Sequence, residues 1–185
     1  MFPSFQLNSL DQYDQYKVAA STEHSGCFVF QHIGNPQIFK LEILLNLSPE
    51  VAMRGLTNVP LYKVWHPEVV QGDIKLGISS DNCAISYQKH REYSKWYRER
   101  DFLYLRHIFK LHNDYYIADK SIENTNFIPF DTIHRGRIIY QIAKVSPSST
   151  GTKLVMECQI DHGGLLNRSH ANELTLRYLL GFQKM

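Results

Sequence analysis

One stretch near the middle of the chain constrains the fold most, because it is apolar on both faces of an expected strand. Side chains alternate along a strand, so residues 100–111 divide into two faces. One face carries Phe102, Tyr104, Arg106 and Ile108, and the other carries Leu103, Leu105, Phe109 and Leu111. The guanidinium of Arg106 then lies among aromatic and aliphatic side chains, where it needs an ionic partner or a wet cavity. The stretch therefore indicates an internal site.

Patterns on either side of this stretch predict further strands and a final helix. Apolar alternation and turn signals predict strands near residues 27–30, 38–47, 69–78, 83–87, 115–122, 137–145 and 153–161. Ser48-Pro49-Glu50 predicts the start of a helix that ends near Thr57, and residues 8–20 read as a short polar helix. Helical spacing of apolar residues predicts an amphipathic helix at the end of the chain, with Ala171, Leu174, Tyr178 and Phe182 on one face. This order of elements is typical of the α+β class.

The composition favours one globular domain over residues 1–185. A chain of 185 residues without a linker-like run is long enough to bury its own core. The net charge of +2 does not by itself indicate a polyanionic partner. Cys27, Cys83 and Cys158 are far apart, which favours reduced thiols over a disulfide framework. No apolar run reaches the ~18 residues of a membrane span and no basic signal-peptide start is present, so we expect a cytoplasmic protein.

Several short motifs follow one another in a defined order. Trp65 follows the Ser-Pro-Glu helix, Arg-Asp-Phe-Leu-Tyr-Leu-Arg fills residues 100–106, and Ser121 lies in the next strand. Arg135 or Arg137 opens the following strand, and Asp161-His162-Gly163-Gly164 precedes a helix that carries Asn172. In this order and spacing the motifs resemble those of the START (steroidogenic acute regulatory protein-related lipid transfer) domains. The resemblance extends from about residue 28 to residue 185.

The resemblance implies a helix-grip fold, in which a curved antiparallel β-sheet wraps around a long C-terminal α-helix and encloses a hydrophobic tunnel. It also implies a function, which is to hold one lipid, a phospholipid, sterol or sphingolipid, and to exchange it with membranes. Enclosure is needed because each exposed CH₂ of a lipid chain costs roughly 0.8 kcal/mol in water. We accordingly expect a monomer with one lipid per chain, transient membrane contact, no cofactor, no metal and no nucleic-acid partner.

Ten residues are candidates for lining the tunnel or meeting the head group of the lipid. They are Tyr62, Trp65, His66, Tyr87, Phe102, Tyr104, Arg106, Asn172, Leu176 and Leu179. In sterol-binding relatives the arginine matching Arg106 pairs with an acid on the preceding strand, but Tyr87 stands at that position, so we expect this ion pair to be absent. Arg106 then either faces the tunnel or finds another buried partner.

The lipid class also stays open, because residues that contact the head group in the relatives are replaced in this chain. Phosphatidylcholine-binding relatives carry an arginine and an aspartate where this chain has Tyr62 and His66. The rings of Tyr62 and Trp65 remain able to meet a quaternary ammonium through cation–π contacts. The alternative interpretation of Trp65 is an ordinary core tryptophan.

The loop before the central strand mixes basic and aromatic side chains. In START domains this loop and the last helix gate the tunnel and touch the membrane. The candidate membrane-contact residues are therefore Lys89, Arg91, Lys95, Trp96, Tyr97 and Arg98. A solvated loop whose aromatic side chains cover the core is the alternative.

Three other functions stay open. A hydrolase or cyclase-type enzyme is compatible with the same fold, because fold does not determine function. We nevertheless expect no enzyme, because the sequence carries no metal-ligand spacing, no Gly-x-Ser-x-Gly elbow and no phosphate-binding glycine loop. A nucleic-acid-binding module would use the basic and aromatic residues of 89–100. A regulatory module would hold a lipid as a signal without exchanging it.

Overall fold

The structure, a computed structural model, describes residues 10–22, 26–78, 82–92, 98–123 and 133–185. Within these ranges ten strands form one sheet in the order β1-β2-β3-β10-β9-β7-β6-β5-β4, and the short β8 pairs with β6. The β6–β8 pair is parallel, and the other pairs are antiparallel. The strands are β1 (Tyr16–Thr22), β2 (Cys27–His32), β3 (Ile38–Leu45), β4 (Val69–Ile78), β5 (Cys83–His90), β6 (Arg100–Leu111), β7 (Asp114–Ser121), β8 (His134–Arg135), β9 (Arg137–Ser148) and β10 (Gly151–Asp161).

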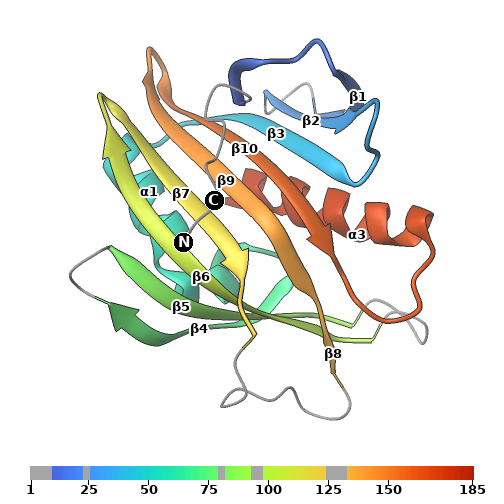
Figure 1. Ribbon diagram of the computed structural model, residues 1–185. Coiled ribbons are helices and arrows are strands. Elements are labelled where there is room, and N and C mark those ends of the chain that lie inside the picture. Colours follow the sequence, from blue (N-terminus) through green and yellow to red (C-terminus); the bar gives the residue numbers. More distant parts are fainter. Residues whose placement is uncertain (1–9, 23–25, 79–81, 93–97, 124–132) are drawn as a thin grey trace.

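The helices lie on the inner, concave face of this sheet. They are α1 (Pro49–Thr57), α2 (Tyr62–Trp65) and α3 (Arg168–Gly181), with single 3₁₀ turns at Val59–Leu61 and Phe182–Lys184. Figure 1 shows the sheet curving around α3, which runs behind β9, β10 and β3 in this view, while α1 lies behind β6 and β7. This arrangement confirms the predicted α+β class and the helix-grip fold.

The predicted caps and alternation account for most of these elements. The hydroxyl of Ser48 accepts a hydrogen bond from the Val51 amide, and Pro49 occupies the first helical position, so α1 starts and ends where predicted. On β6 the side chains of Phe102, Tyr104 and Arg106 point to the same face, as their alternation predicted.

The predicted helix over residues 8–20 is wrong. Residues 16–22 form strand β1, which pairs with β2 from Tyr16 opposite His32 to Thr22 opposite Cys27. A bulge between Val18 and Ala20 breaks the register of this pairing. Because a bulge interrupts the two-residue period of a strand, the sequence of β1 shows no clean alternation.

The hydrophobic core lies between the inner face of the sheet, α1 and α3. Its fully buried members include Leu41, Ile43, Leu56, Val145, Leu154, Met156, Cys158, Leu179 and Phe182, and β2 and β6 add Cys27, Val29 and Tyr104. The core therefore holds the C-terminal end of α3, which carries Leu179. The first residues of α3, 168–170, are exposed.

The outer face of the sheet carries a separate polar cluster under the N-terminal part of the chain. The ammonium of Lys40 is fully buried, donates a hydrogen bond to the Gln12 carbonyl oxygen at 2.6 Å and lies 3.7 Å from the Glu157 carboxylate. The hydroxyls of Tyr16 and Tyr140 donate to the same carboxylate. These contacts tie the chain before β1 to β3 and β10.

Candidate functional site

An aromatic cluster joins α2 to the C-terminal half of α3. The Tyr62 and Trp65 ring centroids are 4.8 Å apart, and the Trp65 and Phe182 centroids are 5.6 Å apart. The ring of His66 lies 5.0 Å from that of Tyr178 and 5.1 Å from that of Phe182. Three of the predicted lipid-binding residues thus lie together, against the helix that the sheet surrounds.

Both ring nitrogens of His66 are used in this cluster. Nε2 lies 2.9 Å from the Tyr178 carbonyl oxygen, and the Glu68 amide donates to Nδ1 at 3.3 Å. A carbonyl oxygen only accepts, so Nε2 carries the proton and the ring is neutral. Burial lowers the pKa of His66 to about 4, although the bond to Tyr178 opposes this shift. A Cβ added at Gly181 would lie 2.4 Å from this ring, so α3 approaches His66 closely.

Arg106 forms a buried ion pair on the inner face. Its Nε donates to Asp119 Oδ1 at 2.8 Å, its Nη2 donates to Oδ2 at 2.7 Å, and its Nη1 donates to the Leu56 carbonyl oxygen at 2.7 Å. Burial disfavours the charged guanidinium, but Asp119 and nearby tyrosines raise the pKa of Arg106 well above its ordinary value. Of the two alternatives for Arg106, a tunnel-facing side chain or another buried partner, the structure shows the second. The acid lies on the following strand, whereas the residue opposite Arg106 on the preceding strand is Ala84.

Several buried polar atoms have no hydrogen-bond partner within the described part of the chain. They are Ser86 Oγ on β5, Gln141 Oε1 on β9 and Trp65 Nε1 on α2. Ser86 lies opposite Tyr104 and shares its inner face, and the amide nitrogen of Gln141 donates to Asp119 at 3.0 Å. Buried polar atoms are normally paired, so these atoms offer hydrogen bonds to a polar group of a ligand.

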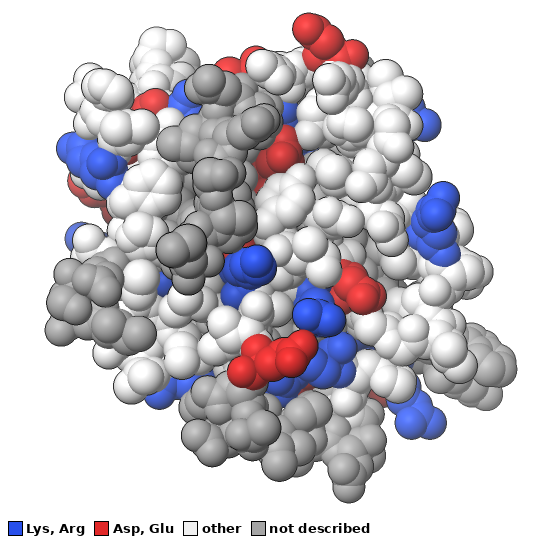
Figure 2. Space-filling view, viewed as in Figure 1, with Lys and Arg blue, Asp and Glu red and all other residues white. Residues whose placement is uncertain are grey.

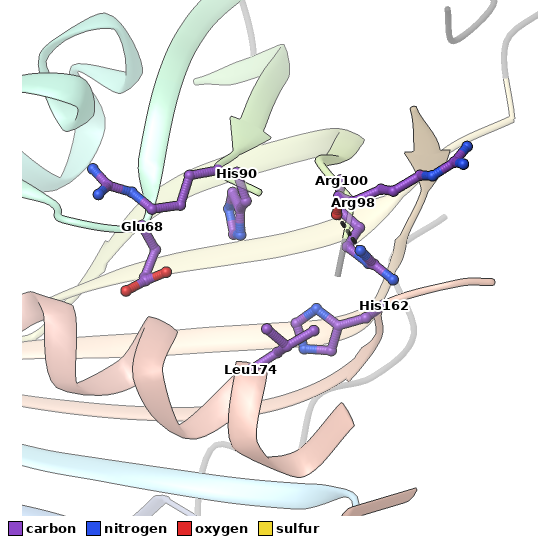
Figure 3. Close-up of a pocket in the computed structure, with 7 residues that line it drawn as sticks. Glu68, His90, Arg98, Arg100, His162 and Leu174 are labelled. Carbon is purple, nitrogen blue, oxygen red and sulfur yellow. Dashed lines mark hydrogen bonds between the residues drawn. The ribbon is translucent and has the colours of Figure 1, made fainter. Parts of the chain in front are cut away.

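A small cavity lies where the ends of β5, β6 and β10 meet α3. We call it the gate cavity, and it is lined by Glu68, His90, Arg91, Arg98, Arg100, His162 and Leu174. Figure 3 shows the guanidinium of Arg100 directed toward His162, with Leu174 of α3 below. Its volume of about 20 Å³ has room for about one water molecule.

Two neutral histidines form the inner wall of the gate cavity. The ring of His90 lies between Phe102, at 4.7 Å, and Tyr178, at 5.3 Å. His162 Nε2 lies 2.9 Å from the Thr175 hydroxyl, which itself donates to the Ala171 carbonyl oxygen. Burial, with the nearby Arg100 cation, lowers the pKa of His162 to about 3. Burial and the neighbouring histidines lower the pKa of His90 well below its ordinary value.

The other predicted site residues divide between the two faces of the sheet. Tyr87 alternates with the inward-facing Ser86 and points to the outer face, where the Lys75 ammonium lies 5.0 Å from its ring. Leu179 is fully buried under the sheet, and Leu176 and Asn172 are half-buried on α3. The structure therefore does not bring Tyr87 together with the other candidates.

The predicted membrane-contact residues also separate. Lys89 forms an ion pair with Glu99 at 2.8 Å, which ties the end of β5 to the residue before β6. Arg91 and Arg98 are exposed at the gate cavity. Lys95, Trp96 and Tyr97 lie outside the described residues.

Sequence reasoning missed several residues of this site. Asp119, Gln141, His90 and His162 were not among the candidates, although Asp119 follows Tyr115 and Ile117 on one face of an otherwise apolar strand. A lone acid on an apolar face was the available signal. His90 and His162 gave no such signal, because one ends a strand and the other follows one.

Comparison with known families assigns the chain to one of them. Residues 18–185 match the family model described as the START domain. The chain belongs to the START domain family. Comparison with curated proteins gives no significant match for this START domain.

Solved structures support the same fold. Human StAR-related lipid transfer protein 5 superposes with a TM-score of 0.84 at 18% identity, covering 96% of this START domain and 89% of that chain. Human STARD10 gives a TM-score of 0.81 at 16% identity, with 96% and 75% covered. An aromatase/cyclase from Streptomyces gives a TM-score of 0.56 at 10% identity, with 79% and 90% covered. At these identities the similarity indicates the fold alone.

Two further observations concern the helices and the charged surface of this START domain. Among the described residues no helix has the length and apolar character needed to cross a bilayer. Figure 2 shows Lys and Arg side chains interspersed with Asp and Glu on the face viewed there, without an extended patch of one sign among the coloured residues.

Proposed function

We propose that this START domain holds one lipid between α3 and the inner face of the sheet and exchanges it with membranes. The observation that carries the proposal is the set of buried polar atoms left without partners beside an aromatic and aliphatic interior, namely Ser86 Oγ, Gln141 Oε1 and Trp65 Nε1. A ligand that is mostly apolar and carries a few polar groups complements such an interior. Two similar structures are named as lipid transfer proteins, which supports the same class.

The gate cavity is too small to admit a lipid as it stands. The gate cavity measures about 20 Å³, whereas pockets for even drug-sized ligands measure ~300 to 1000 Å³. The C-terminal half of α3 is fixed by His66, Leu179 and Phe182, and the exposed residues 168–170 begin its other half. We place the moving part in the first turns of α3, and we assign the transient membrane contact to the same end of the molecule.

A transfer assay between vesicles tests this function. Donor vesicles carry a fluorescent, quenched phospholipid, sterol or ceramide, and the purified chain is added with acceptor vesicles in excess. We expect dequenching at a rate proportional to the protein concentration for at least one of the three lipids. No protein-dependent transfer and no lipid retained by the protein would contradict the proposal.

Two neighbouring residues of α3 provide a matched pair of variants. Leu176 packs against the core, so Leu176→Ser removes apolar surface from the face of α3 that meets the core. Arg177 instead pairs with Glu173 one turn earlier on the helix surface, at 2.7 Å. We expect Leu176→Ser to shorten the retention of lipid at least threefold and Arg177→Ser to leave it unchanged, after both variants are checked for folding by circular dichroism.

An enzymatic function is not part of the proposal. The similarity to an aromatase/cyclase, at 10% identity, indicates a shared fold alone. Within the described residues no group of three or more His, Cys, Asp or Glu side chains is arranged to hold a metal ion.

A further inference from the structure

The gate cavity differs in charge from the interior behind it. Its lining contains three arginines against a single glutamate, so its net charge is positive. Glu68 lies near both Arg91 and Arg177, which lower its pKa against the larger, raising effect of burial. The glutamate is therefore associated with the Arg91 side of the cavity, and Arg98 and Arg100 supply the positive charge on the opposite side.

Arg100 is the cation that reaches farthest inside. Its side chain is 4% exposed, and its Nη1 donates to the carbonyl oxygen of Arg98. The backbone of Arg100 is held between His90 on β5 and His134 on β8, which fixes where the side chain starts. Its charge acts on His162 across the cavity, and Figure 3 shows its guanidinium directed toward that ring. The guanidinium thus faces a wall of neutral histidines and the aliphatic Leu174.

The side chains next to the gate cavity on its inner side are aromatic and histidine rings. Behind Arg100 come the rings of His90, Phe102 and His162, with the His162 and Phe102 centroids 6.0 Å apart. Tyr178 stacks on the other side of His90, and Leu179 of the main core is the next residue on α3. A molecule with an anionic end and an apolar body would place its anionic end against the arginines of the gate cavity and its apolar body against these rings.

We propose that the gate cavity binds the phosphate ester of a phospholipid head group, with Arg100 as its principal ligand and Arg98 at the rim. A guanidinium suits this task because its planar fork donates two hydrogen bonds to two phosphate oxygens. The acyl chains pass His90 and lie between α3 and the sheet. This inference rests on the proposed lipid-binding function and narrows the ligand to phosphate-bearing lipids.

The gate cavity is too small for a phosphate group, so some of its lining must move when the lipid enters. A phosphate group needs more space than one water molecule, so the exposed side chains of Arg91 and Arg98 must move aside. The first turns of α3, which carry Leu174 at the same cavity, must move with them. The phosphate site therefore reaches its full size only when the lipid enters.

Competition among lipids tests the inference. The purified chain is incubated with vesicles containing equal amounts of phosphatidylcholine, phosphatidic acid, diacylglycerol, ceramide and cholesterol, and the lipids that it retains are extracted and quantified. We expect the two phosphate-bearing lipids together to exceed diacylglycerol at least tenfold. Arg100→Gln should reduce this ratio about tenfold, and Arg98→Gln should reduce it about threefold.

Three controls keep the result interpretable. Arg137 is exposed on β9 and pairs with Glu123, so Arg137→Gln changes the net charge equally without touching the gate cavity and should leave the ratio unchanged. Arg100→Lys preserves the charge and should retain most of the preference if Arg100→Gln does not fold. Glycerol 3-phosphate tests phosphate alone and should not displace the lipid at millimolar concentration.

The outcomes separate this inference from the proposed function. Retained lipid with a phosphate preference that depends on Arg100 supports both. Retained lipid that is mainly sterol or diacylglycerol, or a preference that the arginine variants do not change, overturns the inference alone. Displacement by glycerol 3-phosphate overturns the assignment to a lipid head group. A wild-type chain that retains no lipid overturns the inference and the proposed function together.

Discussion

Arg106 on β6 and Asp119 on β7 face each other directly across neighbouring strands and join through two parallel hydrogen bonds. The Nε–Oδ1 distance is 2.8 Å and the Nη2–Oδ2 distance is 2.7 Å. Both side chains are buried, with 2% and 0% of their residue surfaces exposed. The pair therefore holds two charges inside the fold, on the inner face of the sheet.

Removing one member of this pair should destabilise the protein strongly. Asp119→Leu leaves the Arg106 charge buried without its carboxylate, and we expect the free energy of unfolding to fall by about 3 to 5 kcal/mol. The double variant Arg106→Met, Asp119→Leu removes both charges and should recover most of this loss. Urea unfolding of the three proteins measures the effect. A double variant less stable than the single one would contradict the argument.

Ser86 and Ser121 make a matched pair on the sheet. Ser86 Oγ has no hydrogen-bond partner within the described residues, whereas Ser121 Oγ accepts from the Ile138 amide at 2.8 Å. In lipid-free protein Ser86→Ala should raise the free energy of unfolding by about 1 kcal/mol, and Ser121→Ala should lower it by about 1 kcal/mol. Ser86→Ala should also weaken lipid retention. Loss of stability in Ser86→Ala would mean that its hydroxyl is already satisfied.

Gly181 lets α3 approach His66. A Cβ at residue 181 would lie 2.4 Å from the His66 ring, which two hydrogen bonds hold in place, whereas a Cβ at Gly77 on β4 would meet nothing within 4 Å. Gly181→Ala should lower the free energy of unfolding by about 1 to 2 kcal/mol, since overpacking outweighs the gain in helix propensity. The expected change for Gly77→Ala is below 0.5 kcal/mol. Thermal unfolding compares them, and equal effects would contradict the close approach.

The buried histidines should make the fold sensitive to acid. In the unfolded chain a histidine takes up its proton near pH 6.5, whereas folded His66 and His162 stay neutral to about pH 4 and pH 3 because burial lowers the pKa of each. Their contribution to stability is complete above about pH 6.5 and is lost as the pH falls from there toward the folded pKa values. Between pH 8 and pH 5 each histidine should cost about 2 kcal/mol.

Variants at His162 test this pH dependence. His162→Gln can still donate to the Thr175 hydroxyl but cannot be protonated in the unfolded chain. The loss of stability between pH 8 and pH 5, measured by urea unfolding at each pH, should therefore shrink by about 2 kcal/mol in this variant. An unchanged loss would show that other groups cause the acid sensitivity.

Local patterns in the sequence predicted much of the fold for physical reasons. The alternation of Phe39, Leu41 and Ile43 predicted β3, because one face of that strand packs on the core. The Ser48 cap and Pro49 predicted the start of α1, since both act on the first helical turn. Strand β1 escaped prediction because its bulge hides the period.

The site was less accessible to sequence reasoning because it depends on which strands lie side by side. The partner of Arg106 is set by the β6–β7 register, which places Asp119 opposite it, and no local pattern reveals that register. His90 on β5 and His162 after β10 are separated by β6, β7 and β9 in the sheet order. They meet at the gate cavity because the sheet curves around α3, which Figure 1 shows.

Native mass spectrometry of the purified chain, after incubation with vesicles of mixed phospholipids, sterol and ceramide, tests the central claim most directly. The account predicts a complex of one chain with one lipid, which dissociates to the bare chain when the protein is denatured. A chain that keeps its bare mass while circular dichroism shows it to be folded would contradict the claim that the space between α3 and the sheet holds a lipid.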